Sequence, residues 1–273
     1  MPQMIVNGTR LYYEEHGDGQ QTMIFAHGLL WSGRMFAQQV GAFQQHYRCI
    51  TFDWRGQGQS EATQAGYDME SLYADTLALI DALNIKMYHF VGLSMGGFIG
   101  LRLAARRPDA VASLILLGTS ADPEPAANIP TYRMLNLAGR WLGFGLVAAP
   151  VMQIMFGQKF LNDPLRAQLR EEWRRRLLTN HRIGITRATK GVITRRGIAD
   201  QLHTIKAPTL ILVGDQDRAT PPAVARRIHE RIPQSQLAII PGAGHTSTVE
   251  EPEAVNAAIL AFLSTLHSST ATK

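Results

Sequence analysis

Residues 92–96 read Gly92-Leu93-Ser94-Met95-Gly96 and lie between a short apolar run at 87–91 and a helix-like segment at 98–105. The arrangement predicts a strand, a tight turn and a helix, with the serine at the turn. Glycine two positions before and after the serine leaves room for the strained backbone of such a turn. In this context the pattern G-x-S-x-G is typical of a serine nucleophile, because free N–H groups at the start of the helix favour negative charge beside it.

Other glycine-rich turns bind phosphates, and this one lacks their patterns. A P-loop ends in Gly-Lys-Ser or Gly-Lys-Thr, and a dinucleotide-binding turn reads G-x-G-x-x-G. Neither pattern occurs at residues 92–97. An accidental strand, turn and helix stays open as an alternative, because the motif is short. The partners that a serine nucleophile needs decide between the two interpretations.

Strand-like and helix-like segments alternate on both sides of this turn, which is typical of an α/β fold with a mostly parallel central sheet flanked by helices. The dipeptide Asn7-Gly8 predicts a hairpin between strands at residues 4–6 and 11–14. Further strands are predicted at residues 22–26, 49–52, 87–91, 112–117, 209–213 and 236–240, and helices at residues 69–83, 98–105, 223–231 and 252–266. Ligands of open α/β sheets bind beyond the carboxyl ends of the strands, so polar residues that directly follow a strand are the candidates for a site.

The alternation of strands and helices breaks in the middle of the chain. A loop signal with two prolines at residues 121–125 is followed by about 75 residues with helical periodicity and no convincing strand. Strands resume after Pro208. We therefore predict one α/β core, residues 1–121 and 201–273, interrupted by a helical insertion, residues 122–200.

The composition is that of a folded globular chain, with 273 residues of which 45% are hydrophobic and 18% charged. The formal net charge is +5, and the excess lies in the insertion, which holds 13 Lys and Arg residues against 6 Asp and Glu residues. A basic segment is one mark of a nucleic-acid-binding protein. Here the arginines alternate with Leu, Trp and Ile at helical spacing, as on solvated helix faces, so we expect no nucleic-acid partner.

The single cysteine, Cys49, excludes an internal disulfide and a cysteine zinc site, and its apolar neighbours at 49–52 predict a buried thiol. The N-terminal residues lack the basic and apolar regions of a secretory signal. No apolar run reaches the ~20 residues of a membrane span. These absences predict a cytoplasmic protein without a membrane partner.

A serine nucleophile needs a base that takes its proton and an acid that orients the base. For a turn of this kind the expected chain order is Ser, then Asp or Glu, then His. Among the four histidines after the insertion, only His245 lies in a loop directly after a predicted strand. His229 lies in a predicted helix and His267 near the C-terminus, so both can be ordinary surface residues. His203 lies in the linker where the chain re-enters the core.

Two carboxylates compete for the role of the acid, both in residues 214–217 after the strand at 209–213. Asp217 lies deeper in the loop, where it can reach a histidine on the neighbouring loop, whereas Asp215 suits the capping of the turn. We therefore predict Ser94, Asp217 and His245 as the catalytic residues.

An oxyanion hole needs two backbone N–H groups that point at the developing charge. Met95, the residue after the serine, is predicted to supply one of them. Leu29, in the loop after the strand at 22–26, is the candidate for the other. His27 in the same loop is predicted to anchor the loop by hydrogen bonds, and the glycine-rich turn at residues 53–60 is predicted to be structural.

Five motifs together resemble the α/β-hydrolase superfamily over the whole chain. Within it, the sequence is similar to small serine esterases, aryl esterases with perhydrolase activity and 3-oxoadipate enol-lactonases, most clearly at residues 217–222 and 245–252. The resemblance implies the α/β-hydrolase fold, in which the insertion is a helical cap over the active site. The motifs are His27-Gly28, Asp53-x-x-Gly56-x-Gly58-x-Ser60, Gly92-x-Ser94-x-Gly96, Gly214-x-x-Asp217 and Gly244-His245.

The residues and the resemblance predict a serine hydrolase that cleaves carboxylic ester or lactone bonds through an acyl-enzyme, with no metal and no organic cofactor. Ser94 argues against the related epoxide hydrolases and haloalkane dehalogenases, which use an aspartate nucleophile. Carbon–carbon bond hydrolases of aromatic catabolism and hydroxynitrile lyases share the serine triad and stay open. A non-catalytic binding protein on the same fold is the alternative from a different class.

The predicted partner is a small-molecule ester or lactone, and the oligomeric state, a homo-oligomer included, stays open. The basic insertion suggests a second hypothesis, an anionic substrate such as an enol-lactone acid. Apolar residues of the insertion either form the acyl pocket or pack the insertion's own core. These residues include Leu135, Trp141, Leu142, Phe144, Met152, Met155, Phe156 and Trp173.

Overall fold

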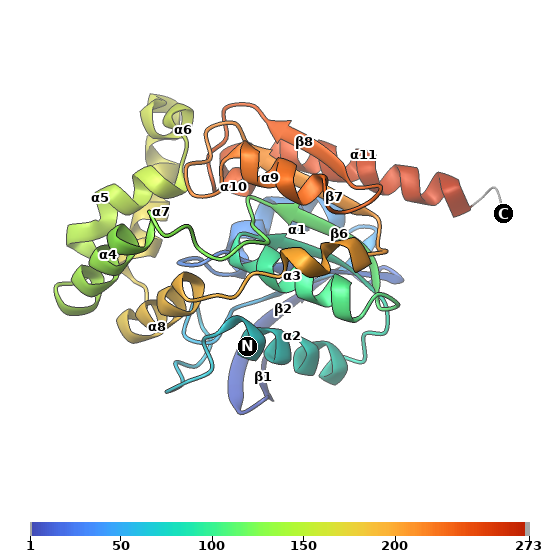
Figure 1. Cartoon of the computed structure of the whole chain (residues 1–273), viewed down its shortest axis with the longest axis horizontal. Coiled ribbons are helices and arrows are strands. Elements are labelled where there is room, and N and C mark those ends of the chain that lie inside the picture. The colour runs from blue at the N-terminus through green and yellow to red at the C-terminus, as the bar shows by residue number, and fades with distance from the viewer. Residues whose placement is uncertain (1, 271–273) are drawn as a thin grey trace.

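The structure is a computed structural model that describes residues 2–270, with the backbone alone for residues 267–270, so the side chain of His267 lies outside the described part. Among these residues, eight strands form one sheet in the order β1-β2-β4-β3-β5-β6-β7-β8 (Figure 1). The strands are β1 Gln3–Val6, β2 Thr9–His16, β3 Gln21–Ala26, β4 Tyr47–Phe52, β5 Tyr88–Leu93, β6 Val111–Leu117, β7 Thr209–Gly214 and β8 Gln236–Ile240. The mostly parallel α/β sheet predicted from the sequence is confirmed.

The first two strands form the predicted hairpin. Asn7 and Gly8 have φ values of 46° and 71°, which are the left-handed values of a type I′ turn. Val6 pairs with Thr9 directly across this turn. β2 then pairs antiparallel with β4, and every later pair in the sheet is parallel.

The parallel strands end at one edge of the sheet, and the candidate residues lie in the turns and loops that follow them. β5 and β7 are buried along their whole lengths, as expected for strands covered on both faces. Ser94 follows β5, Asp217 follows β7 and His245 follows β8. The topology alone therefore brings three residues that are far apart in the sequence to the same edge.

Helices cover both faces of the sheet and bury two apolar clusters. On one face α2 Met69–Ala82, α3 Met95–Arg106 and α9 Pro222–His229 pack together with the 3-10 helix η3 Ala199–Thr204. On the other face α1 Ala37–Phe43 and α11 Pro252–Thr270 pack against the sheet. Asp68 accepts hydrogen bonds from the N–H groups of Glu70 and Ser71 and thereby caps the start of α2.

Between β6 and β7 the chain forms helices and no strand, as predicted for the insertion. They are α4 Ile129–Trp141, α5 Phe144–Met155, α6 Gln158–Asn162, the 3-10 helix η2 Pro164–Arg166, α7 Ala167–Leu178 and α8 Arg182–Ile193. These helices lie together beside one end of the sheet (Figure 1). We call residues 122–200 the cap, and its status as a domain of its own stays a prediction.

Four short elements are absent from the sequence-based expectations. They are the 3-10 helices η1 Gly33–Phe36 and η3, the helix α1, and the four-residue helix α10 Ser247–Glu250. Each spans at most two helical turns, too few residues for hydrophobic periodicity to mark it. None of the helices within residues 2–270 is both long enough and apolar enough to cross a membrane.

Candidate active site

Ser94 lies in a tight turn between β5 and α3 and has a strained backbone. Its φ is 51° and its ψ is −111°, a conformation that residues with a side chain rarely adopt. A Cβ at Gly92 would collide with the Gly96 backbone, and a Cβ at Gly96 would collide with the Ala26 backbone. The residues on both sides of Ser94 are buried, whereas Ser94 is partly exposed. The glycines therefore let the turn present this one hydroxyl outward.

His245 and Asp217 form a buried pair at the same edge of the sheet. The Nδ1 atom of His245 lies 2.9 Å from Oδ2 of Asp217, and the two side chains are 3% and 0% exposed. Burial lowers the pKa of His245, but the Asp217 carboxylate outweighs that effect, so the net pKa is raised. The carboxylate thus fixes the ring and favours its protonated form.

Both oxygens of Asp217 are held by the loop that follows it. Oδ1 accepts hydrogen bonds from the N–H groups of Ala219 and Thr220 at 2.9 and 2.8 Å. Oδ2 accepts a further bond from the Thr220 hydroxyl at 2.9 Å. Asp215, the competing carboxylate, is exposed and accepts instead from the N–H of Gly242 at 2.8 Å. The structure therefore brings Asp217, and not Asp215, to the histidine.

A cavity of about 130 Å³ joins Ser94 and His245 beneath the cap. Its walls are mostly apolar. Of the eight apolar cap residues considered from the sequence, Leu135, Phe144 and Met155 line it. Met152, Phe156 and Trp173 pack instead in the buried cluster around the sheet, and Trp141 and Leu142 are exposed. Further lining residues are Leu29, Leu30, Phe98, Glu124, Tyr132, Asn136, Val147, Val151, Ile154, Ile185, Thr189, Val192, Ile193, Arg195, Ala219 and Thr220.

The loop after β3 lies against the serine turn. A Cβ at Gly28 would come within 3.4 Å of the Ser94 Cβ, and Leu29 lines the cavity. Met95 is the first residue of α3, so its N–H has no acceptor within the helix. The two N–H groups predicted for an oxyanion hole thus belong to segments that adjoin Ser94.

His27 anchors this loop, as the sequence predicts. The N–H of Trp54 donates to its Nε2 at 3.1 Å, and its Nδ1 lies 2.7 Å from the carbonyl oxygen of Gly28. The Trp54 indole N–H donates to the carbonyl oxygen of His27 at 2.7 Å. Burial lowers the pKa of His27 to about 3, so the ring is neutral, accepts through Nε2 and donates through Nδ1.

Leu30 continues this loop in a left-handed conformation, with a φ of 78°. Such a backbone costs a residue with a Cβ about 1 to 2 kcal/mol. Two side chains hold it. The Gln57 Oε1 atom accepts from the Leu30 N–H at 2.9 Å, and the Asn180 amide donates to the Leu30 carbonyl oxygen at 2.8 Å. Gln57 belongs to the core and Asn180 to the cap, so the loop is clamped from both sides.

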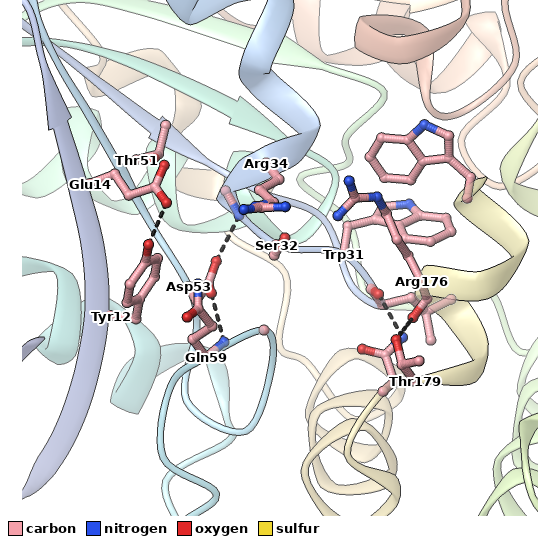
Figure 2. Close-up of a pocket in the computed structure, with 15 residues that line it drawn as sticks. Tyr12, Glu14, Trp31, Ser32, Arg34, Thr51, Asp53, Gln59, Arg176 and Thr179 are labelled. Atoms are coloured by element: carbon pink, nitrogen blue, oxygen red, sulfur yellow. Dashed lines mark hydrogen bonds between the residues drawn. The ribbon is translucent and has the colours of Figure 1, made fainter. Parts of the chain in front are cut away.

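Leu30 also separates the Ser94 cavity from a second, polar cavity of about 300 Å³. Figure 2 shows Tyr12 and Glu14 on one side of this second cavity and Trp31 and Arg176 on the other. Between them, Asp53 accepts hydrogen bonds from the N–H groups of Gly33 and Gln59, while burial raises its pKa to about 6. Asp53 therefore ties the turn at 53–60 to the start of η1, the structural role predicted for that turn.

Sequence reasoning missed three further residues beside the histidine. Thr220 binds Asp217 and also lies 3.3 Å from Nδ1 of His245. Gly118 has a φ of 47°, and a Cβ there would lie 2.9 Å from the Asp217 Oδ2 atom. Gly118 could have been identified from the sequence, because it comes directly after β6, which ends at the same edge of the sheet as the strands before the other candidates.

Glu250 is the third, and it connects the histidine loop to the cap. Its buried carboxylate accepts from the N–H groups of Gly157, Gly244 and Thr246 at 2.7, 2.9 and 3.0 Å. Burial raises its pKa to about 7. Gly244 and Thr246 flank His245, so this one carboxylate fixes the loop that carries the histidine.

One buried ion pair lies in the wall of the Ser94 cavity. The Arg195 guanidinium lies 2.6 Å from the Glu124 carboxylate, and the two side chains are 4% and 7% exposed. Arg195 also stacks over the Phe98 ring at 4.3 Å. Among the described residues, it is the only Lys or Arg side chain that lines this cavity. No group of three or more His, Cys, Asp or Glu residues in the described part is arranged to hold a metal ion.

Comparison with known proteins agrees with this fold. The family model described as the alpha/beta hydrolase fold matches residues 21–252. The chain belongs to the α/β-hydrolase family. A putative carbamate hydrolase, RutD, of Caulobacter sp. (strain K31) is 31% identical over 93% of this chain and 96% of its own. A putative non-heme bromoperoxidase, BpoC, of Mycobacterium tuberculosis is 32% identical over 94% of this chain and 98% of its own.

Two solved structures of the family resemble the chain over nearly its full length. A thermophilic esterase from Thermogutta terrifontis superposes with a TM-score of 0.89 at 29% identity, covering 98% of this chain and 100% of that one. An enol-lactonase from Burkholderia xenovorans LB400 also gives 0.89, at 28% identity over 96% and 100%. The chain is therefore a hydrolase whose relatives differ in substrate.

Proposed function

We propose that this α/β-hydrolase cleaves carboxylic ester bonds of small to medium substrates through an acyl-enzyme on Ser94. The observation that carries the proposal is the buried His245–Asp217 pair at 2.9 Å, whose histidine lines the same cavity as Ser94. A serine, a histidine and a carboxylate in one site are the parts of nucleophilic acyl transfer.

In this mechanism His245 takes the proton of the Ser94 hydroxyl, which attacks the ester carbonyl. Asp217 holds the ring with a proton on Nδ1, so that the other nitrogen is free to act as the base, and it stabilises the imidazolium that forms. His245 then gives the proton to the leaving alkoxide. In the second step His245 activates a water molecule, which releases the acid and restores Ser94.

The negative charge that develops on the substrate oxygen needs donors that are already in place. We assign this role to the N–H groups of Leu29 and Met95. Leu29 is the neighbour of the strained Leu30, so the clamp from Gln57 and Asn180 also sets where the Leu29 N–H points.

Asn180→Ala is expected to lower kcat about tenfold, because a small displacement of an oxyanion donor weakens stabilisation of the transition state. Leu30→Gly in the same background is expected to restore much of the loss, since glycine adopts a φ of 78° without strain. The measurement is kcat and KM for p-nitrophenyl acetate with all four members of the double-mutant cycle.

Thr179→Ala is the matched control, because Thr179 is the exposed neighbour of Asn180 and donates only to the Arg176 carbonyl oxygen. The clamp would be refuted by an Asn180→Ala variant with unchanged kcat. It would also be refuted if Leu30→Gly gave no recovery in that background.

The cavity favours neutral acyl groups over anionic ones. The basic cap suggested an anionic substrate, but its only cation in the cavity wall, Arg195, is already paired with Glu124. A substrate carboxylate would therefore enter a mostly apolar cavity without a free partner, which carries a large desolvation cost.

We expect kcat/KM for p-nitrophenyl hexanoate to exceed that for mono-p-nitrophenyl adipate by about tenfold or more, because only the adipate ester buries a carboxylate. Glu124→Gln is expected to shift the ratio toward the anionic ester, since it leaves the Arg195 guanidinium unpaired. Arg174→Gln, on the exposed face of α7, is the control and should leave the ratio unchanged.

Equal or faster turnover of the anionic ester by the wild-type protein would instead support the alternative function. In that case the substrate is an anion, as for an enol-lactonase or a carbon–carbon bond hydrolase, and lactones and vinylogous diketones with a carboxylate become the next compounds to measure.

A further inference from the structure

Helix α4 presents two different faces. Tyr132, Leu135 and Asn136 line the Ser94 cavity on one side. Met134, Leu137 and Trp141 lie on the other side, where they are exposed. The spacing of three and four residues places these three side chains in one stripe along the helix. α4 is therefore the wall between the substrate cavity and an apolar outer surface.

The exposed stripe continues into the next helix. Leu142, after the end of α4, and Leu146, in α5, are 67% and 68% exposed, and Trp141 is 73% exposed. The other three tryptophans of the chain, Trp31, Trp54 and Trp173, are at most 6% exposed. Single exposed apolar residues are ordinary, but a cluster of large ones indicates an interaction surface.

Basic side chains flank this stripe. Arg133, Arg140, Arg187 and Lys190 line a surface hollow of about 470 Å³ together with Leu137 and Trp141. The Arg140 guanidinium lies 5.6 Å from the Trp141 ring centroid. Two stretches of the cap, residues 125–162 and 173–199, contain no Asp or Glu at all. The helices α4 and α8 therefore offer positive charge, and none of α4, α5 and α8 carries an acidic side chain.

We propose that the outer cap face docks on an anionic phospholipid surface. The outer cap face consists of Met134, Leu137, Trp141, Leu142 and Leu146 with Arg133, Arg140, Arg187 and Lys190. Leucine and tryptophan beside Lys and Arg are the composition of helices that lie in a membrane interface, where the apolar side chains enter the acyl boundary and the cations meet the headgroups.

Charge decides between this occupant and a second copy of the chain. Two copies that met through this face would bring their cations together without acidic partners, which is unfavourable. A surface of anionic lipid supplies the missing negative charge, and each basic residue near it contributes about 1 kcal/mol. The lack of a spanning segment led us to expect no membrane partner, but docking on headgroups requires no such segment.

Docking would place α4 directly between the lipid and the Ser94 cavity. The inner residues of α4 already line that cavity, so an ester dissolved in the lipid would be separated from the site by this one helix. This consequence rests on the proposed function, whereas docking itself does not.

Co-sedimentation with vesicles tests the proposal. The full chain is expected to sediment with vesicles of phosphatidylglycerol and phosphatidylcholine, but not with phosphatidylcholine alone, and to dissociate as salt rises. Because Trp141 is the single exposed tryptophan, its emission should shift to the blue on binding. Ser94→Ala protein should bind as the wild type does, so the docking result is independent of the chemistry.

Leu137→Ser/Trp141→Ser is expected to weaken vesicle binding about tenfold or more, because it removes two large apolar groups from the contact. Met87→Ser is the matched control, since Met87 and Leu137 are each 60% exposed and Met87 lies just before β5, in the core. The melting temperature of each variant shows whether it folds.

Three outcomes would overturn the proposal. One is no sedimentation with either vesicle, and another is equal binding by the wild type and the double variant. The third is a wild-type dimer in light scattering that the double variant loses, which would show that a second copy covers the outer cap face.

Discussion

Ser94→Ala is expected to lower kcat/KM for p-nitrophenyl acetate by about 10⁴- to 10⁶-fold, the loss that follows removal of a serine nucleophile. The variant loses the atom that we propose forms the acyl-enzyme, but it keeps the cavity, the proposed Leu29 and Met95 donors and the His245–Asp217 pair. Initial rates with active enzyme at high concentration measure the residual activity.

The same variant should fold as the wild type does. Alanine and serine both carry a Cβ, so the strain of a φ of 51° at this position is unchanged. Ser264→Ala is the control, because that hydroxyl lies on the exposed side of α11 and donates to the Ala261 carbonyl oxygen. Turnover at the wild-type rate by a folded Ser94→Ala protein would rule out an acyl-enzyme on Ser94.

Asp217→Asn is expected to lower kcat about 10⁴-fold, as when the acid of a serine triad is replaced by its amide. Asparagine can keep the oxygen that accepts from Ala219 and Thr220. Its NH₂ group then faces Nδ1 of His245 and forces that nitrogen to accept. The proton moves to the other ring nitrogen, which can no longer take the proton of Ser94.

Asp215→Asn is the matched control, two residues away in the same loop. Its oxygen can still accept from the Gly242 N–H, and Asp215 does not touch the histidine. Stopped-flow or steady-state kcat values for both variants therefore separate the triad from a general effect of the loop. Equal losses in the two variants would remove Asp217 from its assigned role.

Much of the site could be predicted because its parts follow strands. Ser94, Asp217 and His245 each lie in the turn or loop that follows an apolar run of strand length, and the carboxyl ends of parallel strands meet at one edge of the sheet. The serine turn needs glycines for steric reasons, so it leaves a pattern in the sequence. The structure pairs His245 with Asp217 and not with Asp215. Hydrophobic periodicity alone does not distinguish these two carboxylates.

The supporting contacts could not be predicted because they join distant positions through side chains with no local pattern. Asn180 reaches Leu30 across 150 positions, and Glu250 reaches Gly157 across 93. A positive φ at Leu30 leaves no mark either, since a leucine gives no sign of a left-handed backbone. These contacts depend on how the cap sits on the core, which the order of strands does not determine.

Most basic residues of the cap lie outside the Ser94 cavity. The cap contains 13 Lys and Arg residues, and this positive charge, considered without the structure, suggests an anionic substrate. Of these cap residues, Arg195 alone lines the Ser94 cavity, where it is paired with Glu124. The outer surface around Trp141 instead carries Arg133, Arg140, Arg187 and Lys190. The positive charge therefore points to a surface contact more than to the substrate.

The central claim, an activated serine at position 94, is tested most directly by labelling with a fluorophosphonate and mapping the adduct by mass spectrometry. Cleavage after Lys86 and Arg102 releases a peptide in which Ser94 is the only serine. We expect one equivalent of label on this peptide in the wild type, none in Ser94→Ala and slow labelling in Asp217→Asn. An unlabelled wild-type peptide, or an adduct elsewhere in the chain, would contradict it.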